Sequence, residues 1–311
     1  MTIQTETMSE TSLESAVAPA ALSPTRPLYW SMRRELWENR SLYIAPLIVA
    51  ALALISFAIS AVRLAQNRRL ILALDPVKRA AVVAISYDLA AMAIVVTAGI
   101  VAVFYCLGAL HNERRDRSIL FWKSLPVSDL TTVLAKVSMP LLVLPLIAFA
   151  VAVVLQLTML ALGSIILLAN GLNPMTPPLP LPQMWLVLLY SLAVISLWYA
   201  PIWGWLLMVS AWARRTPFLW AFLPPLALCL VERMAFNTGH FASLLNYRLG
   251  GFSEAFALAP TAGMHGVPPQ IGLAQLDPTR FLSDPGLWVG LLFAAAFLAA
   301  AVWLRRRGDP I

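Results

Sequence analysis

Six long apolar runs constrain the fold of this chain more than any other feature. Each run is close to the roughly 20 apolar residues that an α-helix needs to cross the hydrocarbon core of a bilayer. The runs are continuous, whereas the strands of a membrane β-barrel alternate polar and apolar residues over about ten positions. We therefore predict an all-α integral membrane protein with six transmembrane helices. The predicted spans are Ser41–Val62, Asp88–Leu110, Val137–Leu160, Met184–Trp212, Pro217–Val231 and Gly286–Leu304.

The composition supports this class. Charged residues make up 12% of the 311 residues and hydrophobic residues 60%, whereas a soluble domain carries about 25% charge. The net charge of +7 would suit nucleic acid on a soluble protein. Here the basic residues flank apolar runs, so we expect them to set membrane topology and predict no nucleic-acid partner. Cys106 and Cys229 lie inside apolar runs, where small buried residues are expected rather than a disulfide or a metal site.

The distribution of Lys and Arg predicts the orientation. With the amino terminus inside, the inner segments hold fourteen basic residues and the outer segments hold eight. Inner loops carry the excess of Lys and Arg, so we expect both termini in the cytoplasm. The loop at 63–79, with five basic residues, opposes this bias and has no explanation in the sequence. We expect the long connection at 233–285 to contain short helices or a re-entrant element.

Two segments precede the first span. Residues 1–27 lack the basic start and apolar centre of a secretory signal, and we expect a disordered cytoplasmic tail there. Leu28–Arg40 places Tyr29, Trp30, Met32, Leu36 and Trp37 on one helical arc, opposite Arg34, Glu35 and Glu38. This pattern predicts an amphipathic helix lying in the membrane interface. The alternative is an ordinary extension of the first span.

The chain offers little catalytic chemistry. The phosphate-binding pattern G-x-x-x-x-G-K-[ST] and the metal-binding pattern H-E-x-x-H are both absent from the sequence. ATP binding by the usual loop is therefore excluded, and we expect no enzyme, metal or cofactor in this chain. Two acids adjoin spans: Asp88, which can face water, and Glu232, which can pair at the interface or contact a substrate. An ion-coupled carrier usually needs acids within its spans, and their scarcity argues against one.

Aromatic residues in the fourth span are candidates for lining a substrate pathway. Trp198, Tyr199 and Trp203 cluster around Pro201 and Gly204, where a kink is expected. Together with Glu232 they could line a lateral cavity for amphipathic substrates. The alternative is helix packing with an aromatic belt at the interface.

The connection between the second and third spans has an unusual sequence, ERRDRSILFWKSLPVSDLTTVLAK at Glu113–Lys136. A short polar helix should end before Leu125, because the residue before a proline disfavours helix. Ser128 or Asp129 can then cap the next helix. The predicted elbow could dock a soluble partner through Phe121 and Trp122. Alternatively, it is a topological connection that keeps its charges at the headgroups.

This segment resembles the coupling region of ABC-2 type permeases, the membrane subunits of ATP-binding-cassette exporters. Weaker similarity includes Tyr199–Arg215 and Phe218–Arg233, and with the six-span plan the resemblance extends from about Leu28 over most of the chain. It implies a separate ATPase subunit that binds ATP-Mg, a second permease chain, and a location in the inner membrane. It also implies six candidate coupling residues: Arg114, Arg117, Trp122, Leu125, Pro126 and Asp129.

The expected function is thus the permease of an ABC exporter that moves an amphipathic or hydrophobic substrate. The alternative is a membrane sensor or scaffold that binds a soluble partner through residues 111–136 and transports nothing. The two differ in whether that partner carries ATPase motifs.

Overall fold

The computed structural model describes residues 25–66, 76–116, 128–171, 180–250 and 276–307, and within these ranges every regular element is helical. The predicted tail therefore lies almost entirely outside the described residues. Six helical segments are long and apolar enough to cross a membrane, as predicted. They are Ser41–Arg63, Ala84–Arg115, Asp129–Ala169, Leu181–Trp198, Pro217–Phe236 and Pro285–Arg307.

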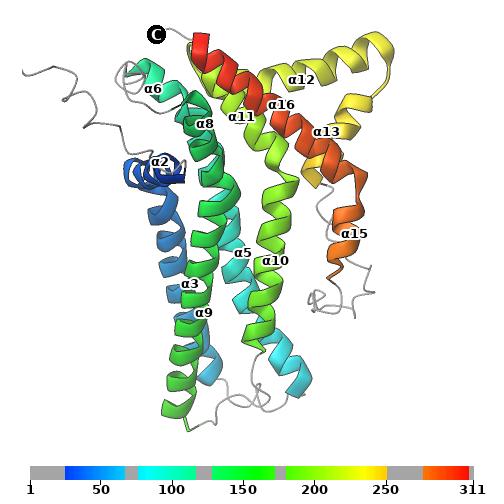
Figure 1. Ribbon diagram of the computed structural model, residues 1–311. Helices are drawn as coiled ribbons and strands as arrows, with labels where there is room; N and C mark the ends of the chain where they lie inside the picture. The colour runs from blue at the N-terminus through cyan, green and yellow to red at the C-terminus, as the bar shows by residue number, and fades with distance from the viewer. Residues whose placement is uncertain (1–24, 67–75, 117–127, 172–179, 251–275, 308–311) are drawn as a thin grey trace, which may run out of the picture.

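Three long helical segments pack against one another on one side of the bundle (Figure 1). They are α3 (Ser41–Gln66), α5 (Pro76–Ala109) and α9 (Leu144–Ala169). Small side chains contribute to this packing, among them Ala98 and Ala102 of α5 and Ala148 and Ala152 of α9, all of which are buried. Small residues let helix backbones approach closely, which is the usual basis of helix association in membranes.

The third span is one continuous helical segment in spite of two prolines near its start. It begins as α8 (Asp129–Ser138), passes through a π-helical turn at Met139–Val143, and continues as α9. Pro140 lies in the π turn and Pro145 in the first turn of α9. A π turn absorbs a local disruption of the hydrogen-bond ladder without ending the helix. The extension to Ala169 also agrees with the apolar residues that follow the predicted end at Leu160.

The fourth predicted span, Met184–Trp212, is two helices that meet near the predicted kink, and only the first has the length of a span. Helix α10 (Leu181–Trp198) ends at Tyr199, and α11 (Ala200–Trp212) begins there with Pro201 in its first turn. Helix α11 then packs along α16 (Pro285–Arg307). Gly204 permits this approach, because a Cβ at this position would lie 3.1 Å from the carbonyl oxygen of Ala294 and 3.3 Å from Cβ of Phe297.

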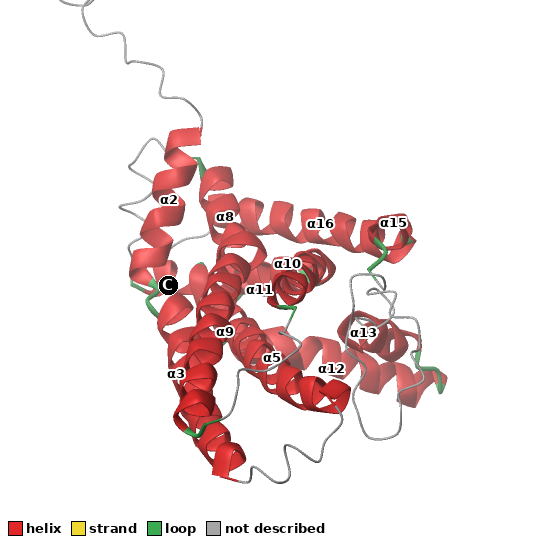
Figure 2. Ribbon diagram, turned by 90° about the horizontal axis from the view of Figure 1, so that it is seen from below, coloured by secondary structure: helices red, strands yellow, loops and turns green. Residues whose placement is uncertain are grey.

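The fifth predicted span departs from the expected arrangement. Helix α12 (Pro217–Phe236) has the length and hydropathy of a span, but it leaves the bundle sideways instead of running beside α3, α5 and α9 (Figures 1 and 2). Of its residues only Ala221 is buried. The chain continues through two short helices, α13 (His240–Gly250) and α15 (Pro278–Ser283). The prediction of short helices in the 233–285 connection is thus confirmed for its described parts.

Helix α2 (Thr25–Glu38) lies across one end of the bundle (Figure 1). Tyr29, Trp30 and Trp37 are exposed, whereas Glu35 is buried at 3% exposure. Arg33 lies 4.5 Å from the ring centroid of Trp37 and also covers Trp30. The helix is confirmed, and it meets the protein through Glu35 together with the partly buried Met32 and Leu36. Its placement in a membrane interface stays a prediction.

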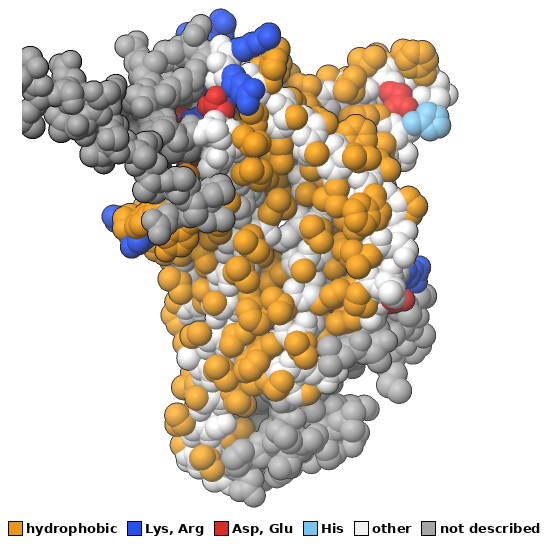
Figure 3. Space-filling model, in the orientation of Figure 1, with side chains coloured by type: hydrophobic (Ala, Val, Ile, Leu, Met, Phe, Trp, Pro, Cys, Tyr) orange, Lys and Arg blue, Asp and Glu red, His pale blue; other side chains and the backbone are white. Residues whose placement is uncertain are grey.

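The surface agrees with a protein that meets lipid. Figure 3 shows hydrophobic side chains over the visible face of the bundle, and Lys and Arg gathered at the end where α2 and the end of α16 lie. Large apolar side chains such as Leu52, Leu89 and Phe104 are about 60% exposed. Apolar patches of this extent are rare on soluble monomers. The chain is therefore of the multi-pass membrane type.

The close contact at Gly204 gives a test of the fold. A Gly204→Leu variant should unfold at a lower temperature in detergent, because overpacking costs about 1–3 kcal/mol. Gly99→Leu is the matched control, since a Cβ at Gly99 meets nothing within 4 Å. Equal unfolding temperatures for the two variants would contradict the packing of α11 on α16.

Candidate functional site

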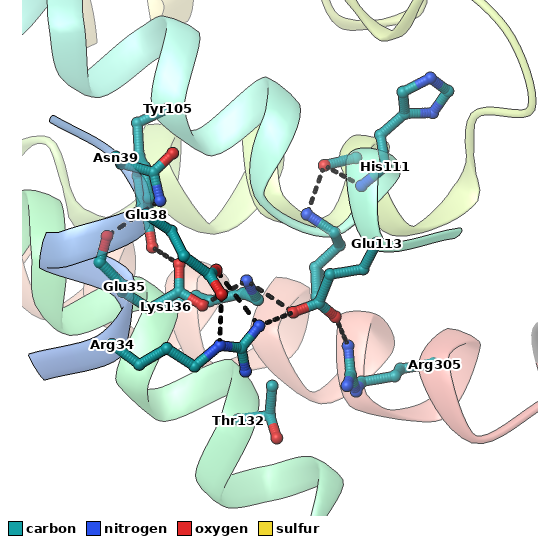
Figure 4. A network of polar contacts seen from close by, with 12 residues as sticks. Arg34, Glu35, Glu38, Asn39, Tyr105, His111, Glu113, Thr132, Lys136 and Arg305 are labelled. Carbon is teal, nitrogen blue, oxygen red and sulfur yellow. Dashed lines mark hydrogen bonds and ion pairs between the residues drawn. The ribbon is translucent and has the colours of Figure 1, made fainter. Parts of the chain in front are cut away.

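A buried cluster of charged side chains lies at the end of the bundle where α2 crosses it (Figure 4). Lys136 of α8 is at its centre and is 2% exposed. Its Nζ lies 2.7 Å from Oε1 of Glu35 on α2 and 3.0 Å from Oε1 of Glu113 on α6 (His111–Arg115). The hydroxyl of Tyr105 on α5 donates to the other oxygen of Glu35 at 2.8 Å. One ammonium group thus joins three helices, and Tyr105 adds a fourth.

Arg305, in the last turn of α16, extends the cluster to both ends of the connection between α6 and α8. Its guanidinium contacts Oε2 of Glu113 through NH1, and its Nε donates to Oδ1 of Asp129 at 3.0 Å. Glu113 precedes the connection and Asp129 follows it. The two stems of residues 116–128 are therefore held by the same side chain.

The short helix α6 is also attached to the end of α11. The hydroxyl of Ser210 accepts hydrogen bonds from the backbone N–H groups of Leu110 and His111, and it donates to the carbonyl oxygen of Leu107. Arg114 donates to the carbonyl oxygen of Ala211 at 2.5 Å. These contacts satisfy backbone groups at the junction of α5 and α6, where the helical ladder is interrupted.

The cluster is electrically balanced. It contains four acids, Glu35, Glu38, Glu113 and Asp129, and four bases, Arg34, Arg114, Lys136 and Arg305. Burying an isolated ion costs several kcal/mol, which only well-placed partners offset. The buried charges Glu35, Glu113, Lys136 and Arg305 therefore depend on one another for their positions. The arrangement suits a mechanical connection between helices, because a shift of α2, α6, α8 or α16 would break an ion pair.

The six residues predicted to contact a partner fall into two groups. Arg117, Trp122, Leu125 and Pro126 lie outside the described residues. Arg114 is 8% exposed and bonded to α11, and Asp129 is bonded to Arg305. Arg114 is thus buried and Asp129 half-buried, and in this structure both hold the stems of the connection. Their predicted contact with a partner stays a prediction.

The start of α8 agrees with its sequence. Ser128 caps the helix, since its hydroxyl oxygen accepts the N–H of Thr131 at 3.1 Å. Ser128 was one of two residues predicted for this role. Asp129 occupies the first turn, where a carboxylate is favoured by the helix dipole.

Sequence reasoning missed the central residues of the cluster. Lys136 and Arg305 were counted only as topological charges, and Glu35 was placed on the polar arc of the first helix with no partner. A weak signal was present, because Glu113 and Lys136 both border predicted spans with opposite charge. Nothing in the sequence indicated that α2 would bring Glu35 to the same place.

A second feature is a lateral groove of about 1000 Å³ between α5 and the α10–α11 pair. Tyr199 and Trp203 line it, in agreement with the proposed pathway residues. Trp198 and Glu232 do not line it. Trp198 is fully buried and donates its indole N–H to the carbonyl oxygen of Arg248 at 3.0 Å. The Cζ atom of the Arg248 guanidinium lies 4.5 Å from the centroid of the Trp198 ring.

Glu232 instead holds the turn between α12 and α13. Its carboxylate accepts the backbone N–H groups of His240 at 2.7 Å and Phe241 at 2.8 Å, and the hydroxyl of Thr238 at 3.0 Å. This carboxylate therefore caps α13. Neither of the two predicted roles of Glu232, pairing at the interface or contact with a substrate, includes this cap. Within the described ranges, no three His, Cys, Asp or Glu side chains gather to hold a metal ion.

The cluster predicts the effect of removing its central charge. Lys136→Met should lower the free energy of unfolding by about 3–5 kcal/mol, because it leaves Glu35 buried without its cation. Chemical denaturation in detergent measures this. Arg306→Gln, at the exposed residue beside Arg305, is the control and should unfold like the wild type. The double variant Lys136→Met, Glu35→Gln should recover part of the loss, and a Lys136→Met protein as stable as the wild type would contradict the cluster.

Comparison with protein-family models, with curated proteins and with solved structures finds no match for this chain. The resemblance to ABC-2 permeases stays a prediction. The features that bear on function are therefore the charged cluster around Lys136 and the groove between α5 and the α10–α11 pair.

Proposed function

We propose that this chain is the permease subunit of an ABC exporter of the ABC-2 type. In this proposal a separate ATPase subunit binds ATP-Mg and docks on the connection between α6 and α8. Two permease chains and two ATPase chains form the transporter in the inner membrane. Both termini face the cytoplasm, as the excess of Lys and Arg at that end suggests.

The main support for the proposal is that Arg305 binds both stems of the connection between α6 and α8. A loop that passes force to membrane helices must be attached firmly at both stems. Glu113 and Asp129 provide this attachment through one guanidinium on α16. Lys136 and Glu35 then extend the attachment to α2, and Tyr105 extends it to α5. A connection that served only topology would need no such attachment.

The groove supports transport over a purely structural role. Helix α5 carries Tyr105 in the cluster and also lines the groove from Ala84 to Val103. Helix α11 carries Ser210 beside the cluster and Trp203 in the groove. A displacement at the cluster would therefore move two walls of the groove.

Co-purification tests the partnership. A tagged chain extracted from native membranes should carry an ATPase with a Walker-A motif, identified by mass spectrometry. Trp122→Ala should reduce the recovered ATPase, because an aromatic anchor at an interface centre is often worth about 2 kcal/mol or more. Arg306→Gln should leave recovery unchanged. If no ATPase is recovered while other membrane complexes survive, the permease proposal fails and the scaffold function replaces it.

Arg305→Gln separates docking from transmission. The ATPase should still co-purify, because the docking residues are retained. However, ATP should no longer change the maleimide labelling of a cysteine introduced at Gly99 in the groove, measured in a Cys229→Ser background. If ATP changes the labelling of the Arg305→Gln variant as much as it changes that of the protein with Arg305, then Arg305 does not transmit the motion.

A further inference from the structure

The groove between α5 and the α10–α11 pair has the dimensions of a ligand site. Its volume of about 1000 Å³ is at the upper end of the range of roughly 300–1000 Å³ for small-molecule pockets. Asp88 and Val103 line it 15 positions apart on α5, which corresponds to about 22 Å along the helix. The space is thus long and narrow enough for an extended hydrocarbon chain.

The lining is apolar along most of this length and polar near one end. Leu89, Met92, Val96, Ile100 and Val103 follow one another along α5. The polar residues Asp88, Gln156 and Gln183 also line the groove. Gln156 lies close to Asp88, since its side-chain amide donates to the carbonyl oxygen of the preceding residue, Tyr87, at 3.3 Å.

Charge selects the kind of ligand. Among the described residues that line the groove, Asp88 is the one carboxylic acid and there is no Lys, Arg or His. Gln156 is already bonded, because it accepts the indole N–H of Trp185 at 2.8 Å and donates to Tyr87. A carboxylate beside an apolar wall attracts a cation and repels an anion. Asp88 is exposed and lies near the start of the second span, and an ionisable residue within a span is a candidate for contact with a ligand.

We propose that the groove binds a single-chain cationic amphiphile, with its amine at Asp88 and its hydrocarbon tail along α5 and α10 toward Trp203. This inference deepens the proposed function by naming a substrate class for it. Binding itself needs only the permease chain, because all the lining residues belong to that chain. The inference can therefore fail while the ATPase partnership holds, and the reverse is also true.

Photolabelling of the full chain in phosphatidylcholine nanodiscs tests the proposal without an ATPase. The probes are hexadecylamine, hexadecanol and hexadecyl sulfate, each with a diazirine in the tail, and labelled peptides are mapped by mass spectrometry. Hexadecylamine should label α5 and α10 along the groove at lower concentration than the other two probes. Asp88→Asn should raise its half-saturating concentration about fivefold and leave hexadecanol unaffected. Asp116→Asn, an acid-to-amide change at an exposed site outside the groove, should change neither.

A second variant tests the position of the ligand without changing Asp88 or the helix packing. Gly99→Leu adds a side chain where the wall of the groove is open, so it should block labelling by the amine without disturbing helix packing. Two results would overturn the proposal. One is equal labelling by the amine and the sulfate with no response to Asp88→Asn, which would mean that lipid tails occupy the groove without headgroup recognition. The other is labelling that survives Gly99→Leu, which would place the probe elsewhere.

Discussion

The burial of the Lys136 ammonium is the constraint on which this end of the molecule depends. A buried cation is tolerated only with acids at hydrogen-bond distance, and these come from α2 through Glu35 and from α6 through Glu113. Glu113 in turn requires Arg305 of α16, which also binds Asp129. The positions of α2, α6, α8 and α16 are therefore mutually dependent, and apolar contacts such as those of Val133 with the Ala301–Val302 pair of α16 add to this.

The cluster of charged side chains and the apolar groove are opposite in chemistry, but helices α5 and α11 contribute to both. Helix α5 contributes Tyr105 to the cluster and Leu89 to the groove, and α11 contributes Ser210 and Trp203 in the same way. A continuous helix transmits displacement along its axis because its hydrogen-bond ladder is stiff. The fold thus connects the place where a partner would act with the place where a ligand would bind.

The sequence predicts the local features of this fold well. Hydropathy locates six helices because each span is a local property, and Pro201 and Ser128 act on their own helices. The sideways course of α12 and the inward face of α2 could not be predicted, because they depend on partners distant in sequence. Glu35 lies 101 positions from Lys136, and Arg305 lies 192 positions from Glu113. For the same reason the contacts of Arg114 with α11 and of Asp129 with Arg305 could not be predicted. Tyr199 and Trp203 were predicted near the groove because their helix break is local.

The distance between the connection and α16 tests the central claim most directly. Spin labels at Asp116→Cys and Arg306→Cys, in a chain with Cys106→Ala and Cys229→Ser, report this distance by double electron–electron resonance. If Arg305 holds both stems, the distribution is single and narrow, and it broadens when Arg305→Gln is added. A distribution that is equally broad with and without Arg305 would contradict the claim that this side chain fixes the connection to the membrane helices.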